Sequence, residues 1–251
     1  MLRAFALKGI KKMKDARPHQ TSGSALVYIL VAIALLAVLT ASLMEPASQQ
    51  SQAQNSTNLI SEVSSQISLI SSTIQECVLT YPDQDSSLTT TEQKNSPYPI
   101  NPKDAYFSTS TPAASADNSV RYIRCPGNPG GTGATRKNHA LLFGSSSGRS
   151  LPPPPNLFGE WEYYNGADGI FFFTSTSKTD SYIASALTKL DAKYSKCEAD
   201  IIDATASDVN ISSDTTGGAT AVRKCLSGNR CFRYWVVHKS TSVAKEAGCP
   251  D

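Results

Sequence analysis

An unbroken apolar run at residues 25–44 constrains the fold more than any other feature of the chain. The run is 20 residues long and holds no charged side chain. As an α-helix rising about 1.5 Å per residue it spans about 30 Å, which is the thickness of the hydrocarbon core of a bilayer. Eleven of its residues are Leu, Ile or Val, and together they favour insertion by about 3 to 7 kcal/mol. The run predicts a transmembrane helix that stays in the membrane.

The basic residues around this run are distributed unevenly. Six precede residue 18, and the next one along the chain is Lys94. Since positive charges that flank a membrane span remain in the cytoplasm, the N-terminus is predicted to be cytoplasmic and everything after Glu45 to be exported. A cleaved secretory signal is the alternative, but its apolar segment is usually about 7 to 15 residues long, and no convincing Ala-x-Ala site closes this run. The six bases are Arg3, Lys8, Lys11, Lys12, Lys14 and Arg17.

The exported part of the chain is mildly acidic. Beyond the first 17 residues there are 17 basic and 20 acidic side chains. Binding to a phosphate backbone needs a clustered basic face, so nucleic acid is not expected as a partner. The length of 251 residues suits one domain together with an anchor.

Six cysteines all follow the apolar run: Cys77, Cys125, Cys197, Cys225, Cys231 and Cys249. An even number in a translocated region is typical of disulfides, although free cysteines are also common as small buried residues. About 15 pairings are allowed. A bridge from Cys225 to Cys231 closes a short loop, while Cys197 with Cys225, or Cys231 with Cys249, is equally allowed. The cysteine spacing, with no histidine pair nearby, does not favour zinc, so no metal is expected.

Apolar residues recur at steps of three and four beyond the kink-prone Glu45–Pro46 pair. They form one narrow stripe on a predicted amphipathic helix that ends at Tyr81–Pro82. The stripe packs either on the chain's own head or on neighbouring subunits, and packing on the head is the preferred interpretation. Its members are Ile60, Val63, Ile67, Ile70, Ile74 and Cys77.

The remaining sequence predicts an α+β head with a small antiparallel sheet and one further helix. Residues 83–118 are rich in Ser, Thr, Asn, Asp and Pro and are interpreted as a loop or a set of turns. Strand-like runs lie at residues 120–124, 140–143, 169–174 and 231–238. The prolines at 152–155 predict an extended, rigid connector. The second helical pattern has Asp180 as its N-cap and contains Ile183, Leu187, Leu190, Tyr194, Cys197 and Ile201.

Residue types that commonly carry catalysis are sparse in the exported part, so neither an enzymatic site nor a cofactor is expected. His139 and His238 are each interpreted as ordinary strand-edge residues. The glycine-rich run at 127–133 lacks the spacing, lysine and hydroxyl of a phosphate-binding loop, which favours a flexible turn. Four acids show no EF-hand spacing and are expected in solvated loops rather than around calcium: Asp168, Asp200, Asp203 and Asp208.

One segment, residues 158–165, combines aromatic and acidic side chains. Two interpretations of Trp161, Tyr163 and Tyr164 follow. They line a groove for a glycan or peptide, or they belong to the core and the sheet surface. Aromatic residues at this density favour the second interpretation.

The N-terminal layout resembles that of type IV pilins and type II secretion pseudopilins. A basic leader ends at Gly23, and residues 24–29, Ser-Ala-Leu-Val-Tyr-Ile, open the apolar span that runs on into the amphipathic helix. The resemblance implies a leader at 1–23, a transmembrane and amphipathic stem helix at 24–81, and an extracytoplasmic α+β head at 82–251. It also implies that a prepilin peptidase cuts after Gly23 and that Ser24 is N-methylated. Pro46 falls close to where many stem helices of the family carry a proline.

Two positions depart from the family pattern. Tyr28 stands where the family usually has a glutamate, and Ser24 stands where it usually has Phe or Met. Such exceptions occur among tip-type minor subunits, so the resemblance implies a minor pilin or pseudopilin in the bacterial inner membrane, partnered by other pilin-like subunits through the stem helix. The alternative is a signal-anchored periplasmic binding or structural protein that prepilin peptidase does not process, with a ligand in the Trp161–Tyr164 region.

Overall fold

The structure of the chain is a computed structural model that describes residues 22–90, 92, 94–107, 117–128, 138–144, 148–213 and 223–239. By its internal contacts the chain divides into two compact units, Met1–Gln50 and Ser51–Asp251. The first 21 residues of the predicted leader lie outside the described residues. The described part of the second unit is α+β, as the sequence predicts.

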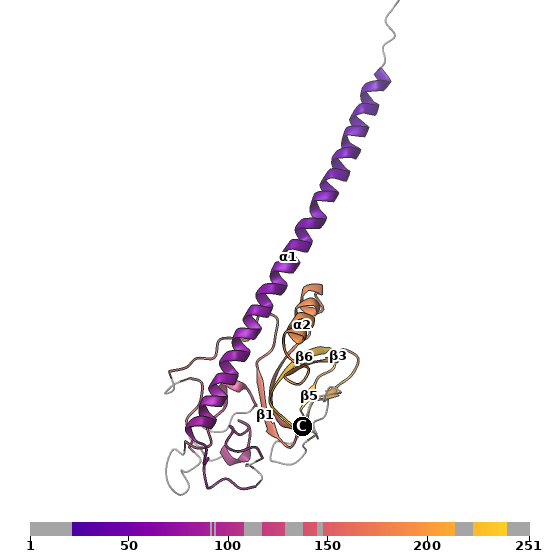
Figure 1. The fold of residues 1–251 in the computed structure, drawn as a ribbon. Coiled ribbons are helices and arrows are strands. Elements are labelled where there is room, and N and C mark those ends of the chain that lie inside the picture. Colours follow the sequence, from indigo (N-terminus) through magenta and orange to yellow (C-terminus); the bar gives the residue numbers. More distant parts are fainter. Residues whose placement is uncertain are drawn as a thin grey trace, which may run out of the picture. The chain divides into compact units, whose positions relative to one another are not determined.

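Helix α1, Ser22–Thr80, is 59 residues long and belongs to both units (Figure 1). Pro46 lies within it, and the side chains of residues 42–48 are outside the described part. The last backbone bond runs from the amide of Tyr81 to the carbonyl of Cys77, at 3.0 Å. Because a proline has no N–H to donate and disfavours the helical conformation of the residue before it, Pro82 accounts for this end. The predicted stop is confirmed.

Within the described residues, no helix combines the length and the apolarity needed to cross a membrane.

The head contains a four-stranded antiparallel sheet with strand order β1-β2-β6-β3. The strands are β1 Glu162–Gly166, β2 Gly169–Thr176, β3 Ala199–Ala204 and β6 Asn229–His238. At the start of β2, Gly169 has φ +127°, and a Cβ there would lie 2.2 Å from the carbonyl oxygen of Val237. Only glycine permits this close approach of neighbouring strands. A second, two-stranded sheet pairs β4 Val209–Asn210 with β5 Lys224–Cys225.

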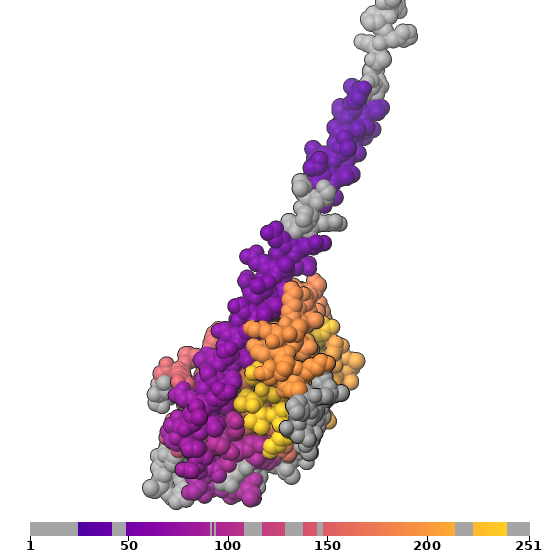
Figure 2. Space-filling model, viewed as in Figure 1, coloured from indigo at the N-terminus to yellow at the C-terminus, as the bar shows by residue number. Residues whose placement is uncertain are grey.

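The two faces of the four-stranded sheet carry separate apolar clusters. Side chains alternate between faces along a strand, so Phe172 belongs to one cluster while Phe171 and Phe173 belong to the other. Helix α2, Ser181–Lys193, and the part of α1 within the second unit cover the first cluster, and they lie side by side in Figures 1 and 2. The second cluster includes Trp235 of β6.

Disulfide bonds staple the head at two described places. Cys77 at the end of α1 is bonded to Cys125, and Cys225 of β5 is bonded to Cys231 of β6. Cys197 is disulfide-bonded as well, while Cys249 lies outside the described residues. The prediction of disulfides is confirmed, and of the pairings left open by the sequence the short Cys225–Cys231 loop is the one formed.

Several predicted elements are wrong. Residues 120–124 form a 3₁₀ helix, Val120–Tyr122, rather than a strand, and residues 140–143 contribute only an isolated bridge at Leu141. Helix α2 ends at Lys193, so the apolar repeat continues past the helix, and Ile201 belongs to β3. Asp180 occupies the N-cap position of α2, but its side chain makes no capping hydrogen bond. The predicted strands at 169–174 and 231–238 are confirmed by β2 and β6.

Candidate functional site

The first part of α1 presents an apolar surface on all sides. Each large apolar side chain between residues 26 and 39 is more than half exposed, from 51% at Val31 to 73% at Tyr28. The only other polar side chain described there, Thr40, donates to the carbonyl oxygens of Leu36 at 3.0 Å and Ala37 at 2.9 Å. Its hydroxyl is therefore satisfied by carbonyl oxygens of the preceding turn of the same helix.

The positions of the predicted leader cleavage are only partly described. Gly23 and Ser24 lie in the first turn of α1, and the side chain of Ser24 is outside the described part. Residues 42–44, the end of the predicted membrane span, are also helical with undescribed side chains. Tyr28 projects from the helix surface.

The second part of α1 is embedded in the head through the predicted stripe. Val63, Ile67, Ile70 and Ile74 are at most 2% exposed and belong to the main core cluster. The stripe therefore packs on the chain's own head, as the preferred interpretation has it. Burial of each such side chain contributes about 1.5 to 3 kcal/mol, so this contact is a major part of the stability of the head.

One buried amide, Gln66, ties α1 to the head. Its Oε1 accepts a hydrogen bond from the indole Nε1 of Trp161 at 2.6 Å, and its Nε2 donates to the carbonyl oxygen of Pro153 at 2.8 Å. Both ends of the amide are thus satisfied at a residue that is 3% exposed. The proline connector is held on the helix by this contact.

The aromatic segment is part of the core and does not line an open groove. Trp161 and Tyr163 are fully buried and Tyr164 is 4% exposed. The Tyr163 hydroxyl donates to the carbonyl oxygen of Pro99, and the Tyr164 hydroxyl donates to Asp168. The groove interpretation of these three residues is corrected, because no ring face or hydroxyl among them is open to a ligand.

His139 is not a strand-edge residue but the centre of a buried polar cluster. Its Nε2 lies 3.2 Å from Asp85 Oδ2 and 3.3 Å from the hydroxyl of Tyr106, and its side chain is completely buried. The Tyr106 hydroxyl donates to the same Asp85 oxygen at 2.5 Å, and the Ser87 amide donates to Asp85 Oδ1 at 2.9 Å. Phe107 packs edge-on against the imidazole.

Burial and hydrogen bonding set the protonation states in this cluster. Burial lowers the pKa of His139 below its ordinary value, although the nearby Asp85 opposes the change. Burial acts to raise the pKa of Asp85, but the hydrogen bonds from Tyr106 and Ser87 and the neighbouring His139 outweigh it and lower that pKa. Burial and Asp85 raise the pKa of the Tyr106 hydroxyl. At neutral pH the cluster is therefore a carboxylate held by a neutral imidazole and a phenol.

Two of the four acids expected in solvated loops are structural. Asp168 is fully buried and accepts hydrogen bonds from the amide and hydroxyl of Ser213. Asp200 forms a two-point ion pair with the buried Arg233. Asp203 and Asp208 make ion pairs nearer the surface, with Arg230 and Lys224. Among the described residues no group of three or more potential metal ligands gathers.

Sequence reasoning missed Gln66, Asp85 and Arg233. For Arg233 a signal exists, since a buried charge within an aromatic strand needs a partner carboxylate, and Asp200 in the apolar run at 199–202 supplies it. Asp85 and Gln66 lie in polar stretches with no periodic pattern, and the partners that bury them are 54 and 95 residues away.

No family model matches this chain, and comparisons with characterised proteins and with solved structures find no match.

Proposed function

We propose that this protein is a membrane-anchored, pilin-like structural subunit, a minor pilin or pseudopilin, of an envelope filament or secretion apparatus. The observation that carries the proposal is the change of surface along α1. Its first part exposes apolar side chains on every side, and its second part is buried in a disulfide-stapled head. In this proposal residues 25–44 lie in the inner membrane and the head faces the periplasm or the exterior.

Processing and assembly follow from the same layout. Prepilin peptidase removes residues 1–23, the new terminus at Ser24 is N-methylated, and other pilin-like subunits pack along the stem helix. Tyr28, which is 73% exposed, stands at the position of the usual glutamate. Because a tyrosine cannot form the ion pair that a buried carboxylate makes, a minor subunit fits this chain better than a major one.

A structural rather than catalytic head is supported by how its buried polar groups are used. Gln66, Asp168 and Arg233 each bond to other parts of the head and hold segments together. The imidazole of His139 is shielded from solvent and contacts Asp85 and Tyr106. These contacts support stability and shape as the role of the head.

Extraction and protease access test the proposed topology. In membranes from the native host, the chain is expected to resist extraction by alkaline carbonate, and its head is expected to be digested in spheroplasts by a protease that cannot enter the cytoplasm. Release of the intact chain by carbonate contradicts the anchor. Protection of the head in spheroplasts contradicts the orientation.

The second candidate is a signal-anchored periplasmic protein that prepilin peptidase does not process. The departures at Ser24 and Tyr28 favour it. The two candidates share the anchor and differ in the mature N-terminus.

A further inference from the structure

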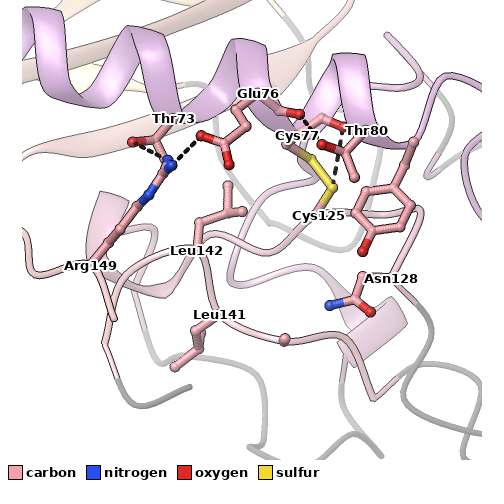
Figure 3. A pocket seen from close by; sticks show the side chains of 11 residues that line it. Thr73, Glu76, Cys77, Thr80, Cys125, Asn128, Leu141, Leu142 and Arg149 are labelled. Carbon is pink, nitrogen blue, oxygen red and sulfur yellow. Dashed lines mark hydrogen bonds and ion pairs between the residues drawn. A yellow bond between two sulfur atoms is a disulfide. The ribbon is translucent and has the colours of Figure 1, made fainter. Parts of the chain in front are cut away.

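A cavity of about 340 Å³ lies where the end of α1 meets the Cys77–Cys125 disulfide (Figure 3). Its volume is within the range of pockets that hold small ligands. Arg149 and Glu76 lie on one side of it and Asn128 on the other, with the disulfide and Leu142 between them. Every residue that lines it belongs to the second unit.

Some polar side chains of this cavity are hydrogen-bonded within the protein, and others have hydrogen-bonding capacity left for a ligand. Arg149 forms an ion pair with Glu76 and donates to the hydroxyl of Thr73 at 3.4 Å. By contrast, within the described part of the chain, the hydroxyl of Tyr81 and the side-chain amide of Asn128 make no hydrogen bond. Both residues are only partly buried. The cavity thus offers one aromatic ring with a hydroxyl and one amide, each with unused hydrogen-bonding capacity.

The disulfide places these two side chains. The amide of Tyr81 donates to the carbonyl of Cys77 at 3.0 Å, and the amide of Asn128 donates to the carbonyl of Cys125 at 3.2 Å. Each is therefore anchored through its backbone to one half of the same disulfide. Gly127 adds a third constraint, because a Cβ at this position would lie 1.9 Å from the Cβ of Tyr81. A site held in place before binding loses little entropy when a ligand arrives.

The charge balance and the apolar surface of the cavity indicate which class of ligand it can bind. Among the described residues that line the cavity, Arg149 and Glu76 are the only charged ones, and they form an ion pair with each other. The floor is apolar, formed by the disulfide, Leu141 and Leu142. A neutral ligand with one apolar face and a polar edge matches this surface. A sugar ring has that form, since its C–H face packs on an aromatic ring and its hydroxyls bond to amide and charged planar groups.

An extended peptide matches the cavity less well. Peptides in such sites are commonly held by backbone pairing along a strand edge. The described lining contains no strand, and its extended residues are already paired, Leu141 with Arg124 and the Leu142 amide with the Ile123 carbonyl at 2.9 Å. We therefore infer that this cavity is a binding site for a neutral saccharide, with Tyr81 and Asn128 as its recognition residues.

Ligand-observed saturation-transfer NMR on the full chain tests this inference. The chain is held in a detergent without a sugar head group, and the probes are the linear trisaccharides of glucose and of N-acetylglucosamine at millimolar concentration. Saturable transfer from at least one of them is expected, and absence of transfer from both overturns the inference. Binding of a neutral extended peptide with no saccharide binding also overturns it.

Four variants show whether the binding uses this cavity. Tyr81→Ala and Asn128→Leu are each expected to weaken binding about tenfold or more, while Tyr81→Phe keeps the ring and most of the affinity. Tyr122→Ala removes another partly exposed tyrosine, outside this cavity, and is expected to leave binding unchanged. Circular dichroism confirms that each variant is folded. Equal affinity of the folded wild-type and Tyr81→Ala chains contradicts the site, whatever the outcome for the membrane anchor.

Discussion

Individual buried polar residues determine how the segments of the head pack on α1 and on each other. Gln66 joins the indole of Trp161 to the backbone of the proline connector. Tyr106 and His139 both form hydrogen bonds with Asp85, and these bonds hold distant loop segments together. Each of these polar residues is at most 5% exposed, and in a buried site an unmade hydrogen bond costs more than a made one contributes. These residues set the fit between segments that apolar packing alone would leave loosely specified.

Replacing Gln66 tests the amide clamp. Gln66→Met keeps the side-chain length but leaves the Trp161 Nε1 and the Pro153 carbonyl without a partner. We expect the free energy of unfolding to fall by about 1 to 3 kcal/mol. Urea titration followed by tryptophan fluorescence measures it. Gln75→Met, at an exposed position of the same helix, is the matched control and should change stability little; equal losses in both variants would refute the clamp.

His139 makes stability depend on pH. Its pKa is lowered in the folded state, so the unfolded chain takes up this proton first as the pH falls. The stability that the neutral ring contributes is complete above the unfolded pKa of about 6.5 and declines below it. The lowered pKa of Asp85 acts in the same direction, but only below the ordinary aspartate pKa of 3.8.

A comparison of two histidine variants isolates this effect. Between pH 7.5 and 5.5 the wild type is expected to lose stability. The His139→Gln chain should lose less, because its amide can still donate to Asp85 but does not titrate. His238→Gln should lose stability as the wild type does. Thermal unfolding at several pH values measures the difference. The same pH slope in wild type and His139→Gln would show that the ring does not control it.

At the level of elements, prediction succeeded where a periodic pattern coincided with a local stop signal. The α1 stripe and Tyr81–Pro82 are of this kind, and so are β2 and β6, whose aromatic and β-branched runs are long. It failed where tertiary pairing overrides local pattern. The sequence pattern at 120–124 is typical of a strand, yet Val120 starts a 3₁₀ helix. The amide of Val120 donates to the carbonyl of Trp161.

The candidate sites divide in the same way. The apolar run of α1 is visible in the sequence because it is contiguous. The cavity beside Cys77 and Cys125 is not, because it gathers α1, a turn and residues 140–142 through a disulfide whose partners are 48 residues apart. The helix interpretation of Ile201 failed because apolar steps of four also suit a strand that follows a helix closely.

The two described disulfides are expected to differ in their contribution to stability. Cys77–Cys125 closes a loop across 48 residues, and Cys225–Cys231 across only 6. The loss of loop-closure entropy in the unfolded chain gives about 4 kcal/mol for the first and about 2 kcal/mol for the second. Denaturant unfolding of Cys77→Ser/Cys125→Ser and Cys225→Ser/Cys231→Ser chains tests this order. A larger loss from the short loop would contradict it.

On the scale of the whole molecule, α1 is both an apolar surface and a structural element of the head. The same helix continues from residues with exposed Leu, Ile and Val into residues buried under the sheet. The exposed face of the second part of α1 is rich in serine and includes Ser61, Ser65 and Ser68, and in the proposed function neighbouring stem helices pack on this face.

Charges placed in the apolar part of α1 test the anchor. Each arginine at the centre of a membrane span costs about 2.5 to 3.5 kcal/mol, so Leu35→Arg/Leu36→Arg offsets most or all of the insertion energy of residues 25–44. We expect this chain to be extracted by carbonate, whereas Ser65→Arg/Ser68→Arg, with the same added charge on the exposed face of α1, remains in the pellet. Immunoblots of pellet and supernatant measure both. Retention of the Leu35→Arg/Leu36→Arg chain would contradict the anchor.

If this chain enters the proposed pilin-like pathway, its mature N-terminus differs from that of a simple signal-anchored protein. The measurement is mass spectrometry of the N-terminal peptide of the protein purified from native membranes in a strain with intact prepilin peptidase. A chain that begins at Ser24 and carries a methyl group on its terminal amine is the predicted result. A chain that retains residues 1–23 would contradict the pilin-like pathway and leave a signal-anchored envelope protein.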